Sequence, residues 1–264
     1  MDIEKRSWER LPTEIKLKIM GMMTEHSGSV ANYALVCRSW QGVFEAANFA
    51  RIRLTTRRLD EFRYMPKERQ RLVKYLWMCI ELQDYDCSEC KWSESSASNH
   101  RHATIIEHTI RNLFGILTTW GNTDLLQLDI SIHSNSDSQH RFKYIRSEPD
   151  VTPPLDTHQT TPSNDPSHDW ENGSPWRLPP TRSVHRLFEA YILSDPPKGP
   201  LPQLPVVTSL LLRRQTRRVC DPYYLRELLE CLPGLRELYY EPWKRLDIEE
   251  QKVYDSGKAS RLCE

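Results

Sequence analysis

Cysteine and histidine residues between positions 87 and 102 are the first candidates for chemistry in this chain. Cys87 and Cys90 form a CxxC pair, which presents two thiolates at a spacing that can chelate zinc. His100 and His102 follow as His-x-His, whereas zinc sites usually space two histidines by about three to five residues. We therefore predict two free loop cysteines, with no metal ligand and no cofactor. A zinc-dependent binding module at Cys87 and Cys90 remains the alternative.

The sequence contains none of the motifs that usually mark a catalytic site. GxGxxG and GxxxxGK phosphate loops do not occur, nor do HExxH, GxSxG or the protein-kinase signatures. Asp124 and Asp129 flank an expected strand, but an isolated carboxylate on the open face of a sheet is usually a surface group. An enzyme needs several groups that converge in one pocket. We therefore predict that the chain is not an enzyme.

The balance of charge limits the class of partner. Lys and Arg together number 36 and so do Asp and Glu, which makes the net charge zero. A neutral chain has no overall field that attracts nucleic acid or an anionic membrane, and we predict neither as a partner. Two local arginine clusters differ from this background. We expect Arg51, Arg53, Arg57 and Arg58 to be solvated at the exit of a helix, and Arg213, Arg214, Arg217 and Arg218 to cap a strand edge or bind an acidic partner.

Length and composition indicate the compartment. At 264 residues the chain can hold one small module and one larger domain. No run approaches the roughly 20 apolar residues that a membrane span needs, and the start, MDIEKRSWERL, has no apolar signal core. Seven cysteines at irregular positions fit reduced, buried thiols better than a disulfide framework. We expect a soluble protein of the cytoplasm and/or nucleus.

The first fifty residues contain more bulky apolar side chains than three short helices can bury. Leu11, Ile15 and Ile19 recur at four-residue steps and form one apolar stripe. Pro12 falls in the first turn, where a helix tolerates it. Further apolar patterns predict a second helix up to Val36 and a third from Trp40 onward. A domain of about forty residues is near the lower limit of independent stability, so the apolar surplus predicts a docking surface.

This stretch resembles the F-box. The Leu11-Pro12 opening, the acidic Glu14 and the run Leu-Val-Cys-Arg-Ser-Trp match its pattern over residues 8–50. The rest of the chain is similar to the F-box proteins that filamentous fungi encode in large numbers. In that family three helices dock on the Skp adaptor of Skp–cullin–F-box ubiquitin ligases. The resemblance implies adaptor contacts at Leu11, Pro12, Ile15, Ile19, Leu35, Val36 and Trp40.

Four later segments share the pattern apolar, two residues, apolar, one residue, apolar, which is typical of a leucine-rich-repeat strand. They begin at Val73, Leu125, Val207 and Leu235, and an amphipathic pattern that predicts a helix precedes each of them. Alternate side chains of a strand point to opposite faces. We therefore expect target contacts from the outward positions Lys74, Trp77, Gln127, Asp129, Ser131, Glu237 and Tyr239.

The spacing of these strands is irregular. The last two patterns begin 28 residues apart, which suits a single repeat, but the earlier spacings of 52 and 82 residues require insertions. Residues 134–181 are rich in Pro, Ser, Thr, Asn and Asp, a composition that predicts a disordered insertion anchored at most by Trp170 or Trp176. An unrelated α/β sheet with similar buried strands is the alternative fold.

These observations predict an α+β or α/β repeat protein. A three-helix F-box over residues 8–50 precedes a short, irregular solenoid over residues 51–264 that resembles leucine-rich repeats, with helices on one side and a parallel sheet on the other. The resemblance implies a substrate-receptor subunit of a ubiquitin ligase, which binds the Skp adaptor, through it a cullin, and an unknown target protein. The alternative is an F-box scaffold that binds the adaptor without cullin.

Overall fold

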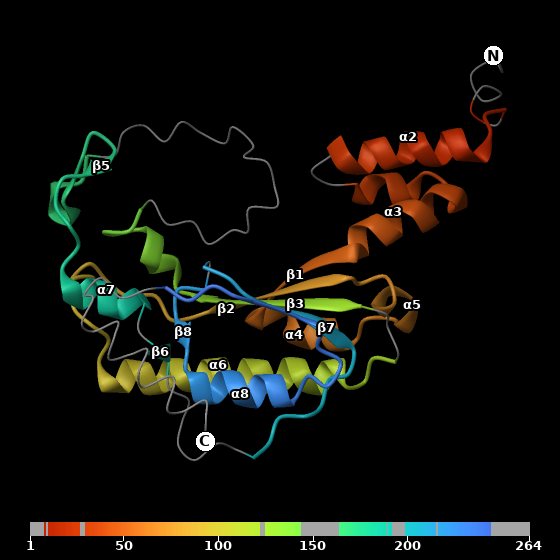
Figure 1. The fold of residues 1–264 in the computed structure, drawn as a ribbon. Coiled ribbons are helices and arrows are strands. Elements are labelled where there is room, and N and C mark those ends of the chain that lie inside the picture. The colour runs from red at the N-terminus through yellow and green to blue at the C-terminus, as the bar shows by residue number, and fades with distance from the viewer. Residues whose placement is uncertain are drawn as a thin grey trace.

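The computed structural model describes residues 8, 10–26, 30–121, 125–143, 164–188, 190–191, 199–214 and 216–243. A helical N-terminal unit leads into a larger body built on a twisted sheet (Figure 1). The N-terminal unit comprises α2 (Thr13–His26), the 3-10 helix η1 (Ala31–Leu35) and α3 (Arg38–Ala50).

The N-terminal unit has a small aromatic core. Of its described side chains, Met20, Val30 and Phe44 are buried. Trp40 and Tyr33 pack around Phe44, with ring centroids 5.4 and 5.2 Å from it. Helix α2 contributes Met20 and Met23 to this core, whereas Leu11, Ile15 and Ile19 of the predicted stripe do not belong to it. The middle element is a short 3-10 helix instead of the expected α-helix.

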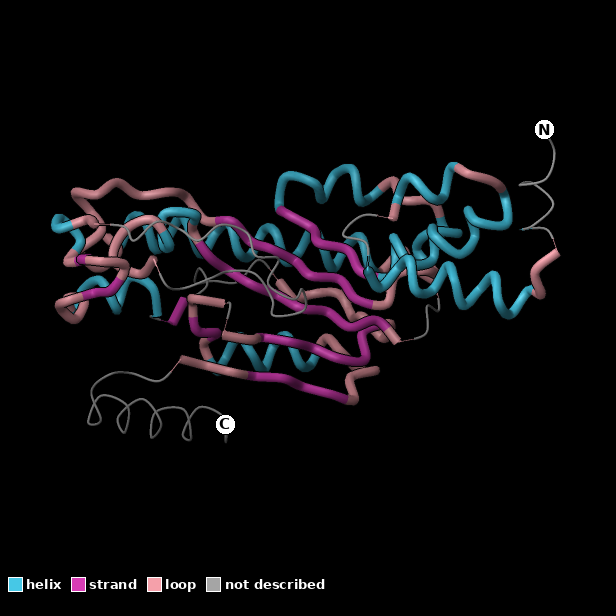
Figure 2. Tube along the Cα trace, turned by 90° about the horizontal axis from the view of Figure 1, so that it is seen from above, coloured by secondary structure: helices cyan, strands magenta, loops and turns pink. Residues whose placement is uncertain are grey.

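Five parallel strands form the sheet of the body. Their order is β1-β2-β3-β7-β9, so each strand of this sheet lies beside the one that precedes it in the chain (Figure 2). Four of them correspond to the strands predicted from the repeated pattern. The strands are β1 (Arg51–Thr55), β2 (Tyr75–Glu81), β3 (Leu126–His133), β7 (Val207–Leu212) and β9 (Glu237–Tyr240).

Strand β1 adds to a sequence-based expectation. We expected Arg51 and Arg53 to be solvated at the exit of a helix, and both are exposed directly after α3. The strand was not expected: it pairs with β2 in register from Arg51–Tyr75 to Thr55–Cys79. Leu54 supplies the reason, because its buried side chain joins the main core from this strand. The alternation of arginine with apolar residues is a period-two pattern that marks a strand at the edge of the sheet.

Two helices of the body cover one face of the sheet, and α7 and α5 lie at its two ends (Figure 1). Helices α6 and α8 run along this face in Figure 1, and α4 lies at its β1 end. Their bounds are α4 (Leu59–Arg63), α5 (Lys67–Gln70), α6 (Ser96–Leu117), α7 (Thr181–Phe188) and α8 (Pro222–Glu230). Helix α8 begins as predicted, because the Asp221 side chain accepts a hydrogen bond from the Tyr223 N–H and Pro222 occupies the first turn.

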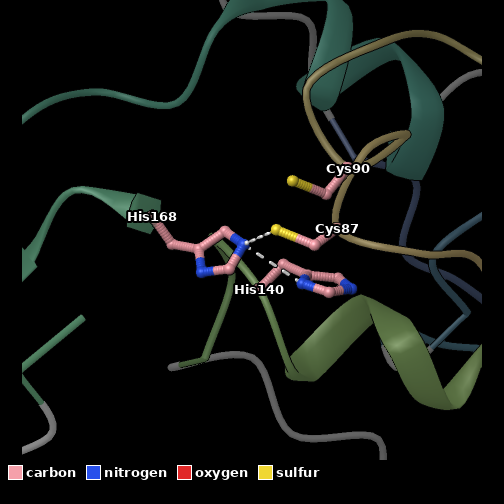
Figure 3. Close-up of side chains that lie close together, drawn as sticks. All are labelled: Cys87, Cys90, His140 and His168. Carbon is pink, nitrogen blue, oxygen red and sulfur yellow. Dashed lines mark hydrogen bonds between the residues drawn. The ribbon is translucent and has the colours of Figure 1, made fainter. Parts of the chain in front are cut away.

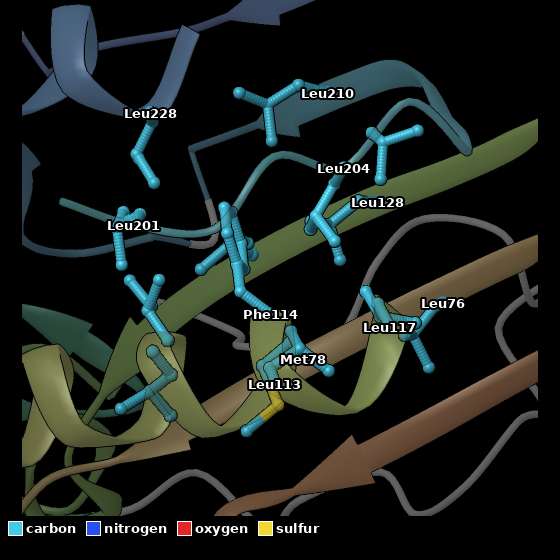
Figure 4. Close-up of a cluster of buried hydrophobic side chains, with 14 of the residues drawn as sticks. Leu76, Met78, Leu113, Phe114, Leu117, Leu128, Leu201, Leu204, Leu210 and Leu228 are labelled. Atoms are coloured by element: carbon cyan, nitrogen blue, oxygen red, sulfur yellow. The ribbon is translucent and has the colours of Figure 1, made fainter. Parts of the chain in front are cut away.

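The core lies between these helices and the sheet. Leu113, Phe114 and Leu117 of α6 face Leu76 and Met78 of β2 in the cluster drawn in Figure 4, and all five side chains are buried. Leu128, Leu201, Leu204, Leu210 and Leu228 extend this core toward β7 and α8. Gly234 is required beside it, since a Cβ atom there would stand 2.2 Å from the Pro205 carbonyl oxygen.

Within residues 134–181 the described parts are folded, where we expected disorder. Ser134 opens η3 (Asn135–Ser138) with a capping box, in which its side chain and that of Asp137 satisfy backbone N–H groups. Residues 164–177 contain η4 (Pro166–His168) and the hairpin β4 (Trp170–Glu171) and β5 (Ser174–Pro175). Trp170 is buried and anchors this segment, whereas Trp176 is exposed. Residues 144–163 lie outside the described part of the chain.

Two further strands and one short helix complete the description. Strands β6 (Ala190–Tyr191) and β8 (Val219–Cys220) pair in parallel, and η2 (Thr56–Arg58) links β1 to α4. The fold is thus a mixture of helices with a parallel sheet, in agreement with the coarser part of the predicted fold class. In the described residues, no helix is both long and apolar enough to cross a membrane.

Candidate functional site

The N-terminal unit exposes large apolar side chains. Leu35 is 85% exposed and Val36 60%; Leu35 is the last residue of η1 and Val36 follows it, whereas Tyr33 and Ala34 of the same helix pack against the core. Ile15 and Met22 are also exposed and stand two turns apart on α2, hence on one side of it. We call Ile15, Leu17, Met22, Leu35 and Val36 the exposed apolar set.

Each predicted adaptor contact has at least part of its side chain accessible. Pro12, Ile15, Leu35 and Val36 are exposed, and Leu11 and Ile19 are half-buried. Trp40 is half-buried because it packs between Trp8 and Phe44, with ring centroids 5.4 Å away in both cases. The predicted residues therefore combine exposed apolar groups with a partly covered aromatic base.

The predicted target contacts fall into two groups. Lys74, Gln127, Glu237 and Tyr239 are exposed, as expected for outward positions.

Trp77, Asp129 and Ser131 are instead buried, and this corrects the prediction for these three residues. The Trp77 ring N–H donates to the Ser131 hydroxyl at 2.7 Å, and the Tyr75 hydroxyl donates to Asp129. Bonds between neighbouring strands thus hold these side chains, which alternation alone placed in solvent.

Arginine side chains close over this polar face. The Arg51 guanidinium lies 4.1 Å from the centre of the Tyr75 ring, and Arg53 lies 4.7 Å from the Trp77 ring. Arg213 forms an ion pair with Asp129 and also donates to the Tyr75 hydroxyl. Burial raises the pKa of Asp129, and burial together with the Asp129 hydrogen bond raises the pKa of Tyr75. This part of the sheet is therefore a closed polar layer.

The second arginine cluster is satisfied inside the chain. Arg213 pairs with Asp129 and Arg218 with Glu94. Arg217 is fully buried and lies 3.6 Å from the equally buried carboxylate of Asp137. Arg214 alone of the four is exposed. The internal pairing supports the expected structural role at the strand edge and leaves little cationic surface for an acidic partner.

A cluster of cysteine and histidine side chains lies near the ends of β2 and β3. Cys87, Cys90, His140 and His168 point toward one another, and one ligand atom from each lies within 4.8 Å of the others (Figure 3). The Cys87 Sγ atom stands 3.1 Å from His168 Nε2, which is 3.2 Å from His140 Nδ1. The cysteines stand on the turn after β2, His140 on the turn after η3, and His168 at the end of η4.

The CxxC pair was recognisable from the sequence, but its partners were not. His102 pairs with Glu94, whose carboxylate lies 3.1 Å from His102 Nδ1, and His100 is exposed on the same helix. His140 and His168 follow the cysteines by about fifty and eighty residues, with α6 and β3 in between. Only the arrangement of the strands brings the three segments together.

The outer ring nitrogens of both histidines have oxygen partners. His168 Nδ1 lies 2.7 Å from the Asp165 carboxylate, and His140 Nε2 lies 3.4 Å from the Tyr85 carbonyl oxygen. Lys143 approaches the same Asp165 oxygen at 2.6 Å, and this hydrogen bond is the main cause that lowers the pKa of Asp165. Burial lowers the pKa of His140, which favours its neutral ring.

Comparison with known proteins identifies no relative. No protein-family model matches the chain, and searches of the curated proteins and of the solved structures find no match either. The function is therefore argued from the residues of this chain.

Proposed function

We propose that this protein is the substrate-receptor subunit of a Skp–cullin–F-box ubiquitin ligase. Residues 8–50 dock the Skp adaptor, and residues 51–264 recruit a target protein. The observation that carries the proposal is the exposure of Ile15, Leu35 and Val36, which belong to the smallest unit of the molecule and stand at positions of the F-box pattern. Its resemblance to the F-box names the adaptor as the occupant.

The energetics favour a partner on this unit. Fully burying a Leu or Val side chain contributes roughly 1.5–3 kcal/mol of free energy. Leu35 and Val36 are mostly exposed in the free chain, so most of this contribution is available to a partner that buries them. Apolar groups that gather on a surface mark an interaction site more reliably than single ones. Trp40 packs on the buried Phe44 in the same unit, so its partly accessible ring adds to the apolar surface. An adaptor groove that takes up Leu35, Val36 and Ile15 would therefore gain several such burial terms at once.

The connection between the two units suits a receptor. Helix α3 ends at Ala50 and β1 begins at Arg51, so no linker separates them. Arg69 at the end of α5 reaches back to α3, where it pairs with Glu45 at 3.3 Å and stacks on Phe49. A body held in this way keeps its orientation when the N-terminal unit is docked, and a fixed orientation raises the effective concentration of a bound target near the conjugating enzyme.

The order of the strands supports a short solenoid resembling leucine-rich repeats. Each strand of the sheet from β2 onward follows a helix and lies beside its predecessor, with helices on one face. This is the succession expected when repeats stack on their neighbours. Exposed positions on the strands and strand edges then offer the target contacts, among them Lys74, Gln127, Glu237 and Tyr239.

A paired substitution tests the docking proposal. Leu35→Asp with Val36→Asp places two carboxylates where the adaptor would bury apolar groups, and we expect adaptor capture from a co-expression pull-down to fall about 100-fold or more. Leu178→Asp is the matched control, since Leu178 is 87% exposed but belongs to the body. Capture that is equal for the double variant and the control would contradict the proposal. Cullin recovered with the adaptor identifies a ligase subunit, and adaptor without cullin identifies the alternative scaffold.

A further inference from the structure

We propose that Cys87, Cys90, His140 and His168 bind one Zn²⁺ ion in a closed, structural site. The site is independent of the adaptor-docking function, because its ligands belong to the body of the protein. It replaces the ligand set that the sequence suggested, since His140 and His168 take the places considered for His100 and His102.

The spacing of the ligand atoms fits tetrahedral zinc. Bonds of about 2.0–2.1 Å to nitrogen and about 2.3 Å to sulfur separate neighbouring ligand atoms by roughly 3.3–3.8 Å. The two ring nitrogens stand 3.2 Å apart, and His168 Nε2 stands 3.1 Å from the Cys87 Sγ atom. All four ligand atoms lie within 4.8 Å of one another. Small movements of side chains therefore complete the tetrahedron.

The hydrogen bonds around the site fix the histidine tautomers. His168 Nδ1–H donates a hydrogen bond to the Asp165 carboxylate, and His140 Nε2–H donates one to the Tyr85 carbonyl oxygen. In neutral rings the nitrogens that remain, His168 Nε2 and His140 Nδ1, each carry a lone pair, and they face one another at 3.2 Å. Two lone pairs so close repel each other unless a cation or a proton lies between them.

These outer contacts are the arrangement that metal-binding histidines use. Such histidines donate the second ring N–H to a carboxylate or a backbone carbonyl, which orients the ring and raises its basicity. Asp165 and the Tyr85 carbonyl supply one of each. Lys143 and Ser167 hold Asp165 in turn, at 2.6 and 2.5 Å. The structure therefore contains the hydrogen bonds that would orient the histidine ligands, as well as the ligands themselves.

The donor set selects the ion and its role. Two thiolates with two imidazoles in a tetrahedral arrangement suit zinc, or less often an iron–sulfur centre. Four protein ligands leave no position open for water or substrate, which is the mark of a structural zinc site. The ion would join the turn after β2, the turn after η3 and the end of η4. It would thereby fasten residues 164–177 to the body, together with the buried Trp170, whose ring N–H donates to the Arg141 carbonyl.

Metal content of the full-length chain is the first test. We expect one zinc per chain by elemental analysis of protein purified under reducing conditions, and tetrahedral thiolate-bound Co²⁺ absorption when the ion is exchanged for cobalt. Cys90→Ser and His168→Gln should each reduce bound zinc about tenfold or more, and Asp165→Asn should weaken zinc affinity about 10–100-fold. Cys37→Ser and His100→Gln are matched controls outside the cluster, and both should keep full zinc.

A second readout keeps the proposal open to refutation if a ligand variant misfolds. Chelation of zinc from the unmodified chain should speed amide hydrogen exchange in residues 164–177 while exchange in α6 stays unchanged. Wild-type protein without zinc or cobalt binding after reconstitution would overturn the proposal. Iron in place of zinc, a Cys87–Cys90 disulfide in protein kept reduced, or zinc lost equally in His100→Gln would also overturn it.

Discussion

The N-terminal unit and the body differ in the kinds of side chain that they expose and bury. The N-terminal unit leaves Ile15, Leu35 and Val36 in solvent and buries few side chains, among them Phe44. The body buries charged groups as well as apolar ones, including Arg217 with Asp137. The N-terminal unit thus exposes apolar side chains, whereas the body buries charged ones.

The proposed docking function accounts for this difference, because a partner would bury the apolar side chains that the N-terminal unit exposes. Apolar exposure costs the free chain what burial would have gained, and apolar groups that gather on a surface mark interaction sites. A buried ion pair seldom adds net stability, because desolvation offsets the attraction, but removing one partner is costly. In the body, removal of one member of a buried ion pair should therefore be strongly destabilising. The N-terminal unit depends on a small core around Phe44.

Phe44→Ala should cause the largest loss of stability, and the loss should be confined to the N-terminal unit. Deletion of a buried phenylalanine ring costs about 3–5 kcal/mol, which is comparable to the whole stability of a unit of some forty residues at roughly 0.05–0.15 kcal/mol per residue. We expect α2 and α3 to lose protection from hydrogen exchange while β2 and β3 keep theirs. Phe114→Ala is the control in the larger core, and it should leave both units folded. Equal loss of protection in both units would show that they fold as one.

Asp137→Ala tests the buried charge of the body. It leaves the fully buried Arg217 without this carboxylate, and we expect a loss of about 3–5 kcal/mol in the free energy of unfolding. Denaturant titration measures it. Asp137→Leu combined with Arg217→Met should recover the part of the loss that comes from the unpaired Arg217, since an apolar pair carries no desolvation cost, but not the part that comes from the Ser134 N–H bond to Asp137. A loss below about 1 kcal/mol for the single variant would mean that the pair is solvated.

His133 should give the body a dependence on pH. Burial, followed by the nearby Arg217 charge, lowers the pKa of His133 from 6.5 to about 4. Between these values the unfolded chain binds a proton that the folded chain does not, so stability falls as the pH falls from about 6.5 to about 4, by about 3 kcal/mol in total. Urea unfolding over this range measures the slope, with Asp137, Arg53 and Arg218 as the other charges near the ring. His133→Gln should flatten the slope, and an unchanged slope would exclude His133 as its source.

Leu35→Ser should have the smallest effect on the free chain. Leu35 is 85% exposed, and substitutions at such positions usually change stability by less than about 0.5 kcal/mol. Thermal unfolding of the isolated protein should therefore be unchanged, while capture of the adaptor should weaken. A clear loss of stability without adaptor would mean that Leu35 packs within the chain, and it would remove the contrast between the two units.

Local pattern predicted much of the fold. The repeated apolar spacing predicted four strands near their observed positions, and Asp221-Pro222 predicted the start of α8. Strand β1 was missed because its arginines alternate with apolar residues and appeared solvated. The burial of Trp77 and Asp129 was also missed, since alternation gives the face of a side chain but not what covers that face. Tyr75, Arg53 and Arg213 cover it, and each comes from a different part of the chain.

The candidate sites divide in the same way. The Leu-Pro opening and the run from Leu35 to Trp40 are short-range patterns, and neighbouring residues alone are enough to indicate an apolar surface there. Cys87 and Cys90 were equally visible, because three residues of spacing suffice to present two thiolates. His140 and His168 were not, since no local spacing relates them to the cysteines.

By itself the sequence determined the apolar stripe of α2, the four predicted strands and the CxxC pair, because periodicity and short spacing are properties of neighbouring residues. The tertiary structure decided which arginines are paired, which outward positions are buried and which histidines face the cysteines. The physical reason is that contact between distant segments depends on the register of the parallel strands, and that register brings residues more than fifty positions apart within hydrogen-bond distance, as it does for Trp77 and Ser131.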